Sequence, residues 1–398
     1  MENFSEAIED REDSGLAPYA IRHRDSGGRI FPEADQPYRT CFQRDRDRII
    51  HSKAFRRLGY KTQVFINSEG DNYRTRLTHS LEVGQIARSV SSVLRLNVDF
   101  AETLALAHDL GHTPFGHAGQ DSLHSLMNHH GGFEHNRQSL RIVSVLESRY
   151  PDYNGLNLSR ATLKGMMKHK QTYECDLLLK DLCNKRREEN PCLEAEIVDQ
   201  CDKIAYNHHD LEDGLDSGFL AYDELDQLPF WKHSRLQVLD EKGEIFKNLR
   251  REVQIRTVIR KMMDACITDL IETTQKNLNE INPASLNDIL SLERSSYPVA
   301  FSREMQEILK ETQNFLRTRL YNHPRVMQMS RRGIRMIEFL FDEYIHNPEI
   351  MPVHVQKRIN DFGLHRVVSD YISGMTDRYA MKQYEYLSGH GNPSFSQL

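Results

Sequence analysis

The sequence predicts an all-α protein, with a helical core followed by an additional C-terminal helical region. The chain has one Trp and 13 Pro among its 398 residues, and proline is the residue that most strongly interrupts a helix. Long stretches are rich in Leu, Glu, Arg, Lys and Gln, which are strong helix formers. In most of these stretches apolar residues recur at three- and four-residue steps, which is the period of an amphipathic helix.

The composition is typical of a soluble globular protein. Hydrophobic residues make up 38% of the chain and charged residues 28%, with a mean hydropathy of −0.64, and the length allows a large core and two subdomains. The net charge of −6 leaves nucleic-acid contacts to local basic patches. The six cysteines show no CxxC pair, which favours a reducing cytoplasm. We expect no signal peptide and no membrane contact, because the N-terminus is acidic and no apolar run reaches membrane-spanning length.

The first half of the chain is expected to begin with a polar arm over residues 1–40. A helix over 44–58 follows, ended by Gly59, and residues 60–66 are expected to be extended, as half of a small hairpin. A longer helix is expected from about Asn72, and a further apolar one over 98–107, where Asp99 and Glu102 are spaced as a capping pair. After a glycine-rich loop, helices are expected over 121–130 and 133–146.

The second half is expected to hold longer helices. Residues 150–192 suggest helical pieces joined by polar loops, and residues 195–214 a strong helix with a buried apolar side. A linker with Pro229 and Trp231 leads to helices over 244–280, 302–320, 331–346 and 352–372. We therefore expect an arm (1–40), a core (41–220) and a C-terminal helical region (221–398) that can pack as one unit with the core.

The chemistry is concentrated after the apolar helix 98–107, where His108 and Asp109 stand side by side. This pair offers an imidazole nitrogen and a carboxylate oxygen to one divalent cation. His79 and Asp202 lie on two other expected helices, and Asp202 sits at the inner edge of its helix, where burial costs free energy unless a cation or donor meets the carboxylate. The alternative is a set of core histidines paired with aspartates. Their joint occurrence favours a catalytic metal site for Mg or Mn, with Fe, Ni or Zn as further possibilities.

The same stretches hold groups that suit phosphate. Arg76 precedes His79 by one helical turn and Lys203 follows Asp202. Further histidines stand close by in the sequence, at His112, His117 and His135.

Taken together, His79, His108-Asp109 and Asp202 resemble the H…HD…D pattern of the HD-domain phosphohydrolases. The flanking residues are similar to those of the deoxynucleoside triphosphate (dNTP) triphosphohydrolases, the bacterial dGTPase-like enzymes related to the mammalian protein that joins a SAM to an HD domain. The likeness runs from about Arg44 to Asp213 and resumes at 368–378. It is carried by the segments 76–80, 108–117, 133–136 and 202–206.

This resemblance implies an HD-domain core that cleaves a dNTP, as in the dGTPases, into a deoxynucleoside and inorganic triphosphate. It implies metal ligands at His79, His108, Asp109 and Asp202. It places His112, His117 and His135 against the α-phosphate as candidate catalytic residues, with His117 favoured as the proton donor. For the substrate it implies Arg76 and Lys203 on the triphosphate, Tyr206 near the sugar, and Asp210 with Gln63 at the 3′-hydroxyl. The chain departs from the family at Gln120, where a carboxylate is common.

Two other functions stay open at this point. One is another HD-type nucleotide phosphohydrolase, although Gly111-His112 stands where hydrolases of guanosine tetraphosphate carry two acidic residues and cyclic-dinucleotide enzymes a lysine. The other is a nucleotide-sensing or single-stranded-DNA-binding protein with a weak hydrolytic site, which would use the basic segments 164–170 and 247–261. The family also implies a homo-oligomer of four or six chains and, in some members, an allosteric nucleotide.

Overall fold

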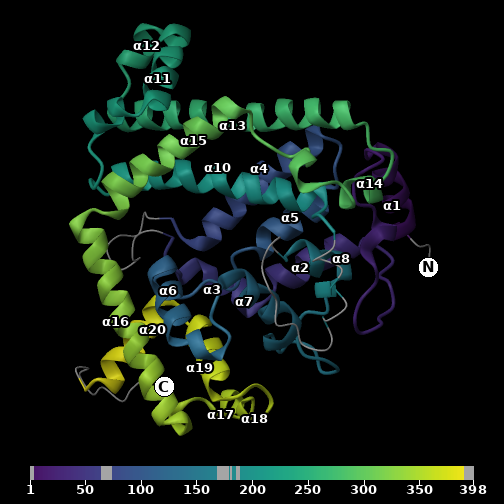
Figure 1. Cartoon of the computed structure of the whole chain (residues 1–398), viewed down its shortest axis with the longest axis vertical. Helices are drawn as coiled ribbons and strands as arrows, with labels where there is room; N and C mark the ends of the chain where they lie inside the picture. The colour runs from purple at the N-terminus through teal and green to yellow at the C-terminus, as the bar shows by residue number, and fades with distance from the viewer. Residues whose placement is uncertain (1–3, 64–73, 168–178, 180–181, 185–188, 390–398) are drawn as a thin grey trace.

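The all-α prediction is confirmed. The computed structural model describes residues 4–63, 74–167, 179, 182–184 and 189–389 (Figure 1). In these ranges the chain is helical, and its β-structure is limited to isolated bridges such as the one between Thr62 and Thr75. Within the described residues no helix combines the length and the apolar character needed to cross a bilayer.

The first half of the chain carries the helices that surround the chemistry. They are α1 (Phe4–Gly15), α2 (Cys41–Ile50), α3 (Lys53–Arg57), α4 (Arg76–Val93), α5 (Val98–Ala107), α6 (Gly116–Leu126), α7 (His135–Arg141) with a π-helical turn (Ile142–Leu146), and α8 (Arg160–Gly165).

The second half contains the longest helices. They are α10 (Leu193–Asp216), α11 (Pro229–Lys242), α12 (Glu244–Lys247), α13 (Arg251–Ile281), α14 (Leu286–Leu290), α15 (Arg303–Leu316) with a π-helical turn (Arg317–Tyr321), α16 (Pro324–His346), α17 (Val353–Gln356), α18 (Ile359–Phe362), α19 (Leu364–Ser373) and α20 (Asp377–Leu387).

Three helices form the centre of the molecule. Helices α4 and α5 pack against each other, and α10 packs against both, while α13 and α15 cover the other side of α10 (Figure 1). The contact faces are fully buried, with Val83 of α4, Ala105 of α5 and Ile204 of α10 at or near zero exposure. Because non-polar burial is the main stabilising term of a fold, this packing fixes the three helices on which the candidate metal ligands stand.

A second apolar cluster joins α6 to the C-terminal helices. It contains Phe115 and Leu123 next to Ile337 of α16 and Val368 and Ile372 of α19. Helix α16 runs down one edge of the molecule toward α17 and α18, and both α19 and α20 pack against α16 (Figure 1). The C-terminal region therefore packs directly on the segment that follows the His108-Asp109 pair.

Several expected elements differ from those observed in the first half. The helix expected over 44–58 is broken at His51, because Ser52 accepts a hydrogen bond from the Phe55 amide and starts α3. Asp99 and Glu102 do not form the expected capping pair. Asn97 caps α5 instead, and both acids bind Arg46. The 1–40 region contains α1 rather than being irregular throughout.

The remaining differences concern where helices begin and end. Helix α4 begins at Arg76 with Thr75 as its cap. Of the extended piece expected over 60–66, Tyr60 instead ends a 3-10 turn (Leu58–Tyr60), and residues 64–66 lie, like Asn72, outside the described residues. Helix α6 begins at Gly116, so His117 lies in its first turn and not on a loop. The expected linker at Pro229 is helix α11, because proline is tolerated in the first helical turn. The helix expected over 352–372 is divided into α17, α18 and α19, and α20 follows where no helix was expected.

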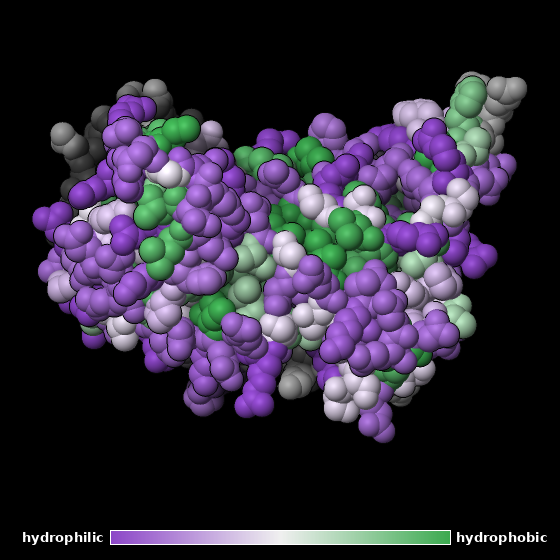
Figure 2. Space-filling model, turned by 90° about the horizontal axis from the view of Figure 1, so that it is seen from above, coloured by the Kyte–Doolittle hydropathy of each residue, from purple (hydrophilic) through white to green (hydrophobic). Residues whose placement is uncertain are grey.

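The face of the molecule seen from the side of α13 is mostly hydrophilic, with hydrophobic residues gathered near its middle (Figure 2). This distribution agrees with the high content of charged residues in the sequence.

Candidate metal centre and phosphate site

The four expected metal ligands converge on one place. His79 extends from the first turn of α4, His108 and Asp109 follow the end of α5, and Asp202 lies in the middle of α10. The His79 Nε2 atom lies 2.9 Å from Asp202 Oδ1. His108 Nε2 lies 3.3 Å from Asp109 Oδ1 and 3.7 Å from Asp202 Oδ1. Two imidazoles and two carboxylates at these distances form a donor set that can surround a single divalent cation.

The orientation of His108 fits metal coordination. Its Nδ1 atom lies 2.6 Å from the Ala105 carbonyl oxygen, which can only accept, so Nδ1 carries the proton and Nε2 presents a lone pair. This Nε2 atom is buried and has no hydrogen-bond partner among the described residues. A lone pair facing two carboxylate oxygens is repulsive unless a cation lies between them. Donation from the second ring nitrogen to a backbone carbonyl is also typical of metal-binding histidines.

A chain of side chains supports His79 from behind. His79 Nδ1 lies 3.3 Å from His209 Nδ1, and His209 Nε2 contacts the Glu82 carboxylate at 2.5 Å. Burial opposes protonation of His79, but the hydrogen bond with Asp202 raises the pKa of His79 above its ordinary value. The same contact lowers the pKa of Asp202 against the effect of burial. These two shifts favour a protonated His79 beside an ionised Asp202, so the carboxylates of the cluster attract positive charge.

Arg76 adds a buried positive charge next to Asp109. Its side chain is 2% exposed, and Nη1 donates to Asp109 Oδ2 at 2.9 Å. The Nε and Nη2 atoms of Arg76 are buried without a hydrogen-bond partner among the described residues. Burial raises the pKa of Asp109, but the neighbouring His108, His112 and Arg76 together hold it well below its usual range. Unused guanidinium donors beside a metal-type cluster are suited to an anionic oxygen.

Three more histidines lie next to this arginine. The rings of His112 and His135 stack at 4.0 Å between centroids, and those of His112 and His117 lie 5.8 Å apart. Burial and the charge of Arg76 lower the pKa of His112 and of His117. Burial lowers the pKa of His135 to about 4 despite the nearby Glu134 carboxylate. All three imidazoles are therefore neutral near pH 7 and can accept a proton when negative charge arrives.

The Gln120 side chain binds His135. Its Oε1 atom accepts hydrogen bonds from both the backbone N–H and the Nδ1–H of His135, at 3.2 and 2.6 Å. The amide therefore fixes the ring orientation and leaves His135 Nε2 as an acceptor. A neutral amide stabilises an imidazolium less than a carboxylate does, in agreement with the low pKa of His135.

Gly111 allows α7 to approach the His108-Asp109 turn. A Cβ atom at this position would lie 2.2 Å from the His135 carbonyl oxygen and 2.3 Å from the Ser139 nitrogen. The Ser139 hydroxyl accepts from the Gly111 N–H at 2.8 Å and donates to the His108 carbonyl at 3.0 Å. This close contact brings His135, at the start of α7, to the cluster.

The residues expected to bind the sugar, Asp210, Gln63 and Tyr206, carry polar groups that are partly unused. The Asp210 carboxylate accepts a hydrogen bond from the Tyr321 hydroxyl, while Asp210 Oδ1 has no partner among the described residues. The Gln63 side-chain oxygen is likewise buried without a partner in the described part of the chain. Tyr206 lies one turn before Asp210 on α10 and contacts Gln313 of α15. These free acceptors suit a hydroxyl donor.

The Asp210 carboxyl has a raised pKa, which makes the stability of the fold depend on pH. Burial raises the pKa of Asp210 to about 7, whereas an aspartate in an unfolded chain titrates near about 3.9. The folded state therefore binds this proton more tightly, and stability is lost as the pH rises from about 4 to 7. Asp210→Asn is expected to raise the free energy of unfolding by about 4 kcal/mol at pH 8 and by little at pH 4. Urea denaturation at both pH values measures this, and an equal change at both would contradict it.

Lys203 differs from the other expected substrate ligands in its position. Its side chain is exposed, and its ammonium donates to Gln200 at 3.1 Å, on the outer side of α10. A residue adjacent to Asp202 on a helix points about 100° away from it, since a helix has about 3.6 residues per turn. Of the twelve expected site residues, Lys203 therefore lies at the edge of the site, on the exposed side of α10.

Sequence reasoning missed three residues of this site. His209 and Glu82 complete the chain behind His79, and Tyr321 binds Asp210. His209 has a weak sequence signal, because it lies seven residues, about two helical turns, after Asp202. Tyr321 has none, because its contact with Asp210 joins positions 111 residues apart.

Comparison with known proteins agrees with this geometry. The HD domain family matches residues 76–207, and the phosphohydrolase-associated domain matches residues 299–386. A protein of Leptospira interrogans named deoxyguanosinetriphosphate triphosphohydrolase-like protein is 47% identical over 378 residues, covering 95% of this chain and 97% of its own. Relatives with the same name in Geobacter metallireducens and Ralstonia pickettii are 43% and 46% identical, covering 96% and 93% of this chain and 98% and 93% of their own. The chain therefore belongs to the family of HD-domain enzymes that resemble deoxyguanosinetriphosphate triphosphohydrolase.

Proposed function

We propose that this enzyme hydrolyses deoxynucleoside triphosphates of the dGTP type at the α-phosphate, releasing a deoxynucleoside and inorganic triphosphate. The observation that carries the proposal is the lone pair of His108 Nε2 facing the carboxylates of Asp109 and Asp202, beside the unused donors of Arg76. A cation site and an anion site lie in direct contact there, which is the arrangement that phosphoryl transfer needs.

The residues present fit a divalent cation, with Mg or Mn as the first candidates and Fe, Ni or Zn as alternatives. His79, His108, Asp109 and Asp202 would hold it. When bound, such a cation lowers the pKa of water and offsets charge on the phosphate oxygens. His209 and Ala105 orient the two imidazoles, so that the donor set is organised before the substrate arrives.

The side chains around the cluster would bind the phosphates and supply the proton for the leaving group. Arg76 binds phosphate oxygens with its free Nε–H and Nη2–H donors, and Lys203 reaches the outer phosphates from the edge of the site. A water oxygen bonds to the α-phosphorus while the bond to the 5′-oxygen breaks, and that oxygen takes up a proton as it leaves. His117 donates this proton, after the phosphate charge has raised its pKa. His112 and His135 position the α-phosphate.

Asp210, Gln63 and Tyr206 would bind the sugar. Asp210 and Gln63 present acceptors to the 3′-hydroxyl, and Tyr206 forms a wall beside them. The Asp210→Asn protein described above is then expected to be more stable at pH 8 than the wild type but less active. The buried carboxylate destabilises the fold at this pH, but the substrate needs it as an acceptor.

No specific observation favours nucleic-acid binding through the basic segment 247–261. Arg256 pairs with Glu212, Lys247 with Glu244 and Lys261 with Glu241. Much of its positive charge is therefore compensated locally. The end of the other basic segment, residues 168–170, lies outside the described residues.

Two further parts of the proposal concern the whole protein. We expect a cytoplasmic homo-oligomer of four or six chains, which light scattering after size-exclusion chromatography would measure. Addition of a second dNTP or of single-stranded DNA to the turnover assay tests the allosteric partners.

The direct test is product analysis. The purified protein is incubated with each dNTP in the presence of Mg²⁺ or Mn²⁺, and the products are separated by ion-exchange chromatography. The proposal expects a deoxynucleoside and inorganic triphosphate in equal amounts. Orthophosphate or pyrophosphate as the primary product would refute it and would favour another HD-type hydrolase.

A further inference from the structure

Two buried side chains tie the C-terminal helices to the loop 112–117, a segment that ends with the first two residues of α6, Gly116 and His117. Asp377 begins α20 and is 2% exposed. Its Oδ1 accepts a hydrogen bond from the Phe115 N–H at 3.0 Å, and its Oδ2 accepts one from the Thr62 N–H at 2.9 Å and another from the Thr62 hydroxyl. Lys61, also 2% exposed, donates from Nζ to the His112 carbonyl and, at 2.8 Å, to the Ser373 carbonyl at the end of α19.

The loop needs such external support. Phe115 has a left-handed backbone with φ of 62°, which costs a non-glycine residue roughly 1–2 kcal/mol. Gly116 follows with φ of 59°, and the Cβ position of Gly116 is 3.6 Å from Arg76 Nη2. The Phe115 side chain packs against Gly333 of α16, where an added Cβ would lie 2.8 Å from Phe115 Cβ. A strained conformation between Arg76 and His117 is thus held in place from the C-terminal side.

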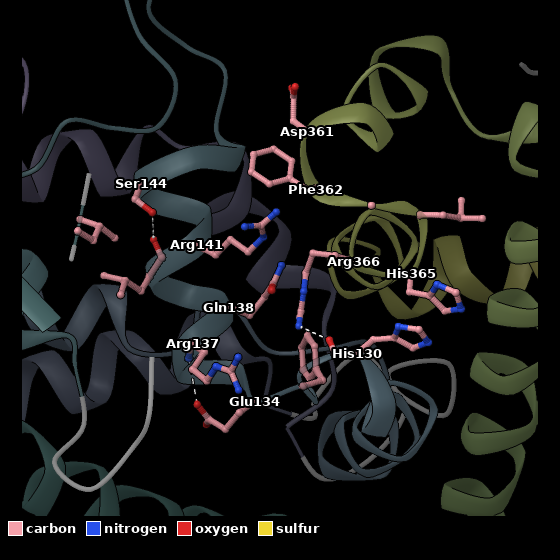
Figure 3. A pocket seen from close by; sticks show the side chains of 15 residues that line it. His130, Glu134, Arg137, Gln138, Arg141, Ser144, Asp361, Phe362, His365 and Arg366 are labelled. Carbon is pink, nitrogen blue, oxygen red and sulfur yellow. Dashed lines mark hydrogen bonds between the residues drawn. The ribbon is translucent and has the colours of Figure 1, made fainter. Parts of the chain in front are cut away.

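The same C-terminal helices also hold α7. The Asp370 carboxylate of α19 pairs with the Arg141 guanidinium at 2.9 Å and accepts from Gln138 Nε2 at 3.1 Å. Figure 3 shows Gln138 and Arg141 extending from α7 toward α18 and α19, which contribute Phe362 and Arg366 on the other side of a cavity of about 470 Å³. Helix α7 carries His135 at its opposite end. All three candidate catalytic histidines therefore stand on segments that α19 or α20 anchors.

We propose that Asp377 and Lys61 are positioning residues, through which α19 and α20 fix the loop 112–117 and so the placement of His112 and His117. The inference rests on the proposed function. It gives a role to the phosphohydrolase-associated region, which contains both Ser373 and Asp377. Neither Asp377 nor Lys61 contacts any of the four expected metal ligands through the hydrogen bonds described above, so the two residues act through the loop.

The first test replaces Asp377 with Asn. The amide replaces one of the two carboxylate oxygens with an NH2 donor, so in the present geometry either Phe115 or Thr62 loses its acceptor. We expect kcat to fall by about 10- to 100-fold, because a displacement of about 1 Å costs about that much, while KM and the metal content stay close to wild type. Glu385→Gln makes the same chemical change at an exposed position of α20 and serves as the matched control.

A second pair of variants covers the case in which Asp377→Asn does not fold. Thr62→Val removes only the hydroxyl donor to Asp377, and Thr62→Ser keeps it. We expect Thr62→Val to lower kcat and Thr62→Ser to recover most of the loss. If folded Asp377→Asn and Thr62→Val proteins both keep the wild-type kcat, the proposal is wrong.

Hydrogen exchange separates this inference from the proposed function. In the Asp377→Asn protein the Phe115 amide is expected to exchange faster than in the wild type, while amides in α4 and α10 keep their rates. This result would support the positioning role even if the wild type hydrolysed no dNTP, which would refute the proposed function alone. Unchanged protection of Phe115 would overturn the positioning role whatever the activity.

Discussion

The Asp109→Asn protein is expected to lose its divalent metal and nearly all dNTP hydrolysis, with kcat/KM reduced by about 10³-fold or more. Asp109 lies at the centre of the site. Its Oδ1 is 3.3 Å from both His108 Nε2 and His112 Nε2, and its Oδ2 binds Arg76 at 2.9 Å. The amide keeps the shape but removes the negative charge that the cation and Arg76 share. Metal analysis and product assays on the same preparation measure both losses.

A matched control is Asp240→Asn, which changes an exposed carboxylate on α11. It is expected to keep the metal and the activity. If the Asp109→Asn protein is folded and retains one metal per chain with wild-type turnover, the assignment of the site fails.

Replacing Arg76 with Met is expected to lower kcat/KM by about 10²- to 10³-fold, the usual cost of removing an oriented donor to a transition-state oxygen. Arg76 binds Asp109 through Nη1 alone, and its other donors are free for the phosphate. Metal content is expected to remain, because Arg76 is no metal ligand. Arg76→Lys should restore only part of the activity, since a lysine lacks the planar fork of donors.

Arg88→Met provides the control for this prediction. Arg88 lies on the same helix, is 44% exposed and pairs with Glu102, so its loss should leave the kinetics unchanged. Wild-type kcat/KM in a folded Arg76→Met protein would show that the triphosphate binds elsewhere.

The metal ligands could be predicted from the sequence, because their residue types and their positions on separate helices are visible in it. His79, His108, Asp109 and Asp202 could be found because metal ligands need specific residue types, and helical spacing puts them on inner faces. Lys203 shows the limit of this reasoning. Its position next to Asp202 suggested a place inside the cluster, but adjacent residues on a helix point in different directions, so Lys203 can meet a substrate only from the exposed edge of the site.

Other features could not be inferred because they depend on contacts between distant segments. Periodicity in the sequence did not show that His117 lies in the first turn of a helix. Helix α6 begins at Gly116 after the left-handed Phe115, and Asp377 holds Phe115 in place. The helix at Pro229 was hidden by a residue that interrupts most helices but is compatible with the first turn. For Gln120 the resemblance implied a hydrogen bond to a catalytic histidine, and the fold shows that this histidine is His135, 15 positions away.

The central claim is that water attacks the α-phosphorus of a dNTP bound between the metal-type cluster and Arg76. Hydrolysis of dGTP in water enriched in oxygen-18, followed by mass spectrometry of the products, tests it most directly. The account predicts inorganic triphosphate that carries one labelled oxygen and a deoxynucleoside that carries none. Label in the deoxynucleoside, or release of labelled orthophosphate or pyrophosphate in place of triphosphate, would contradict it.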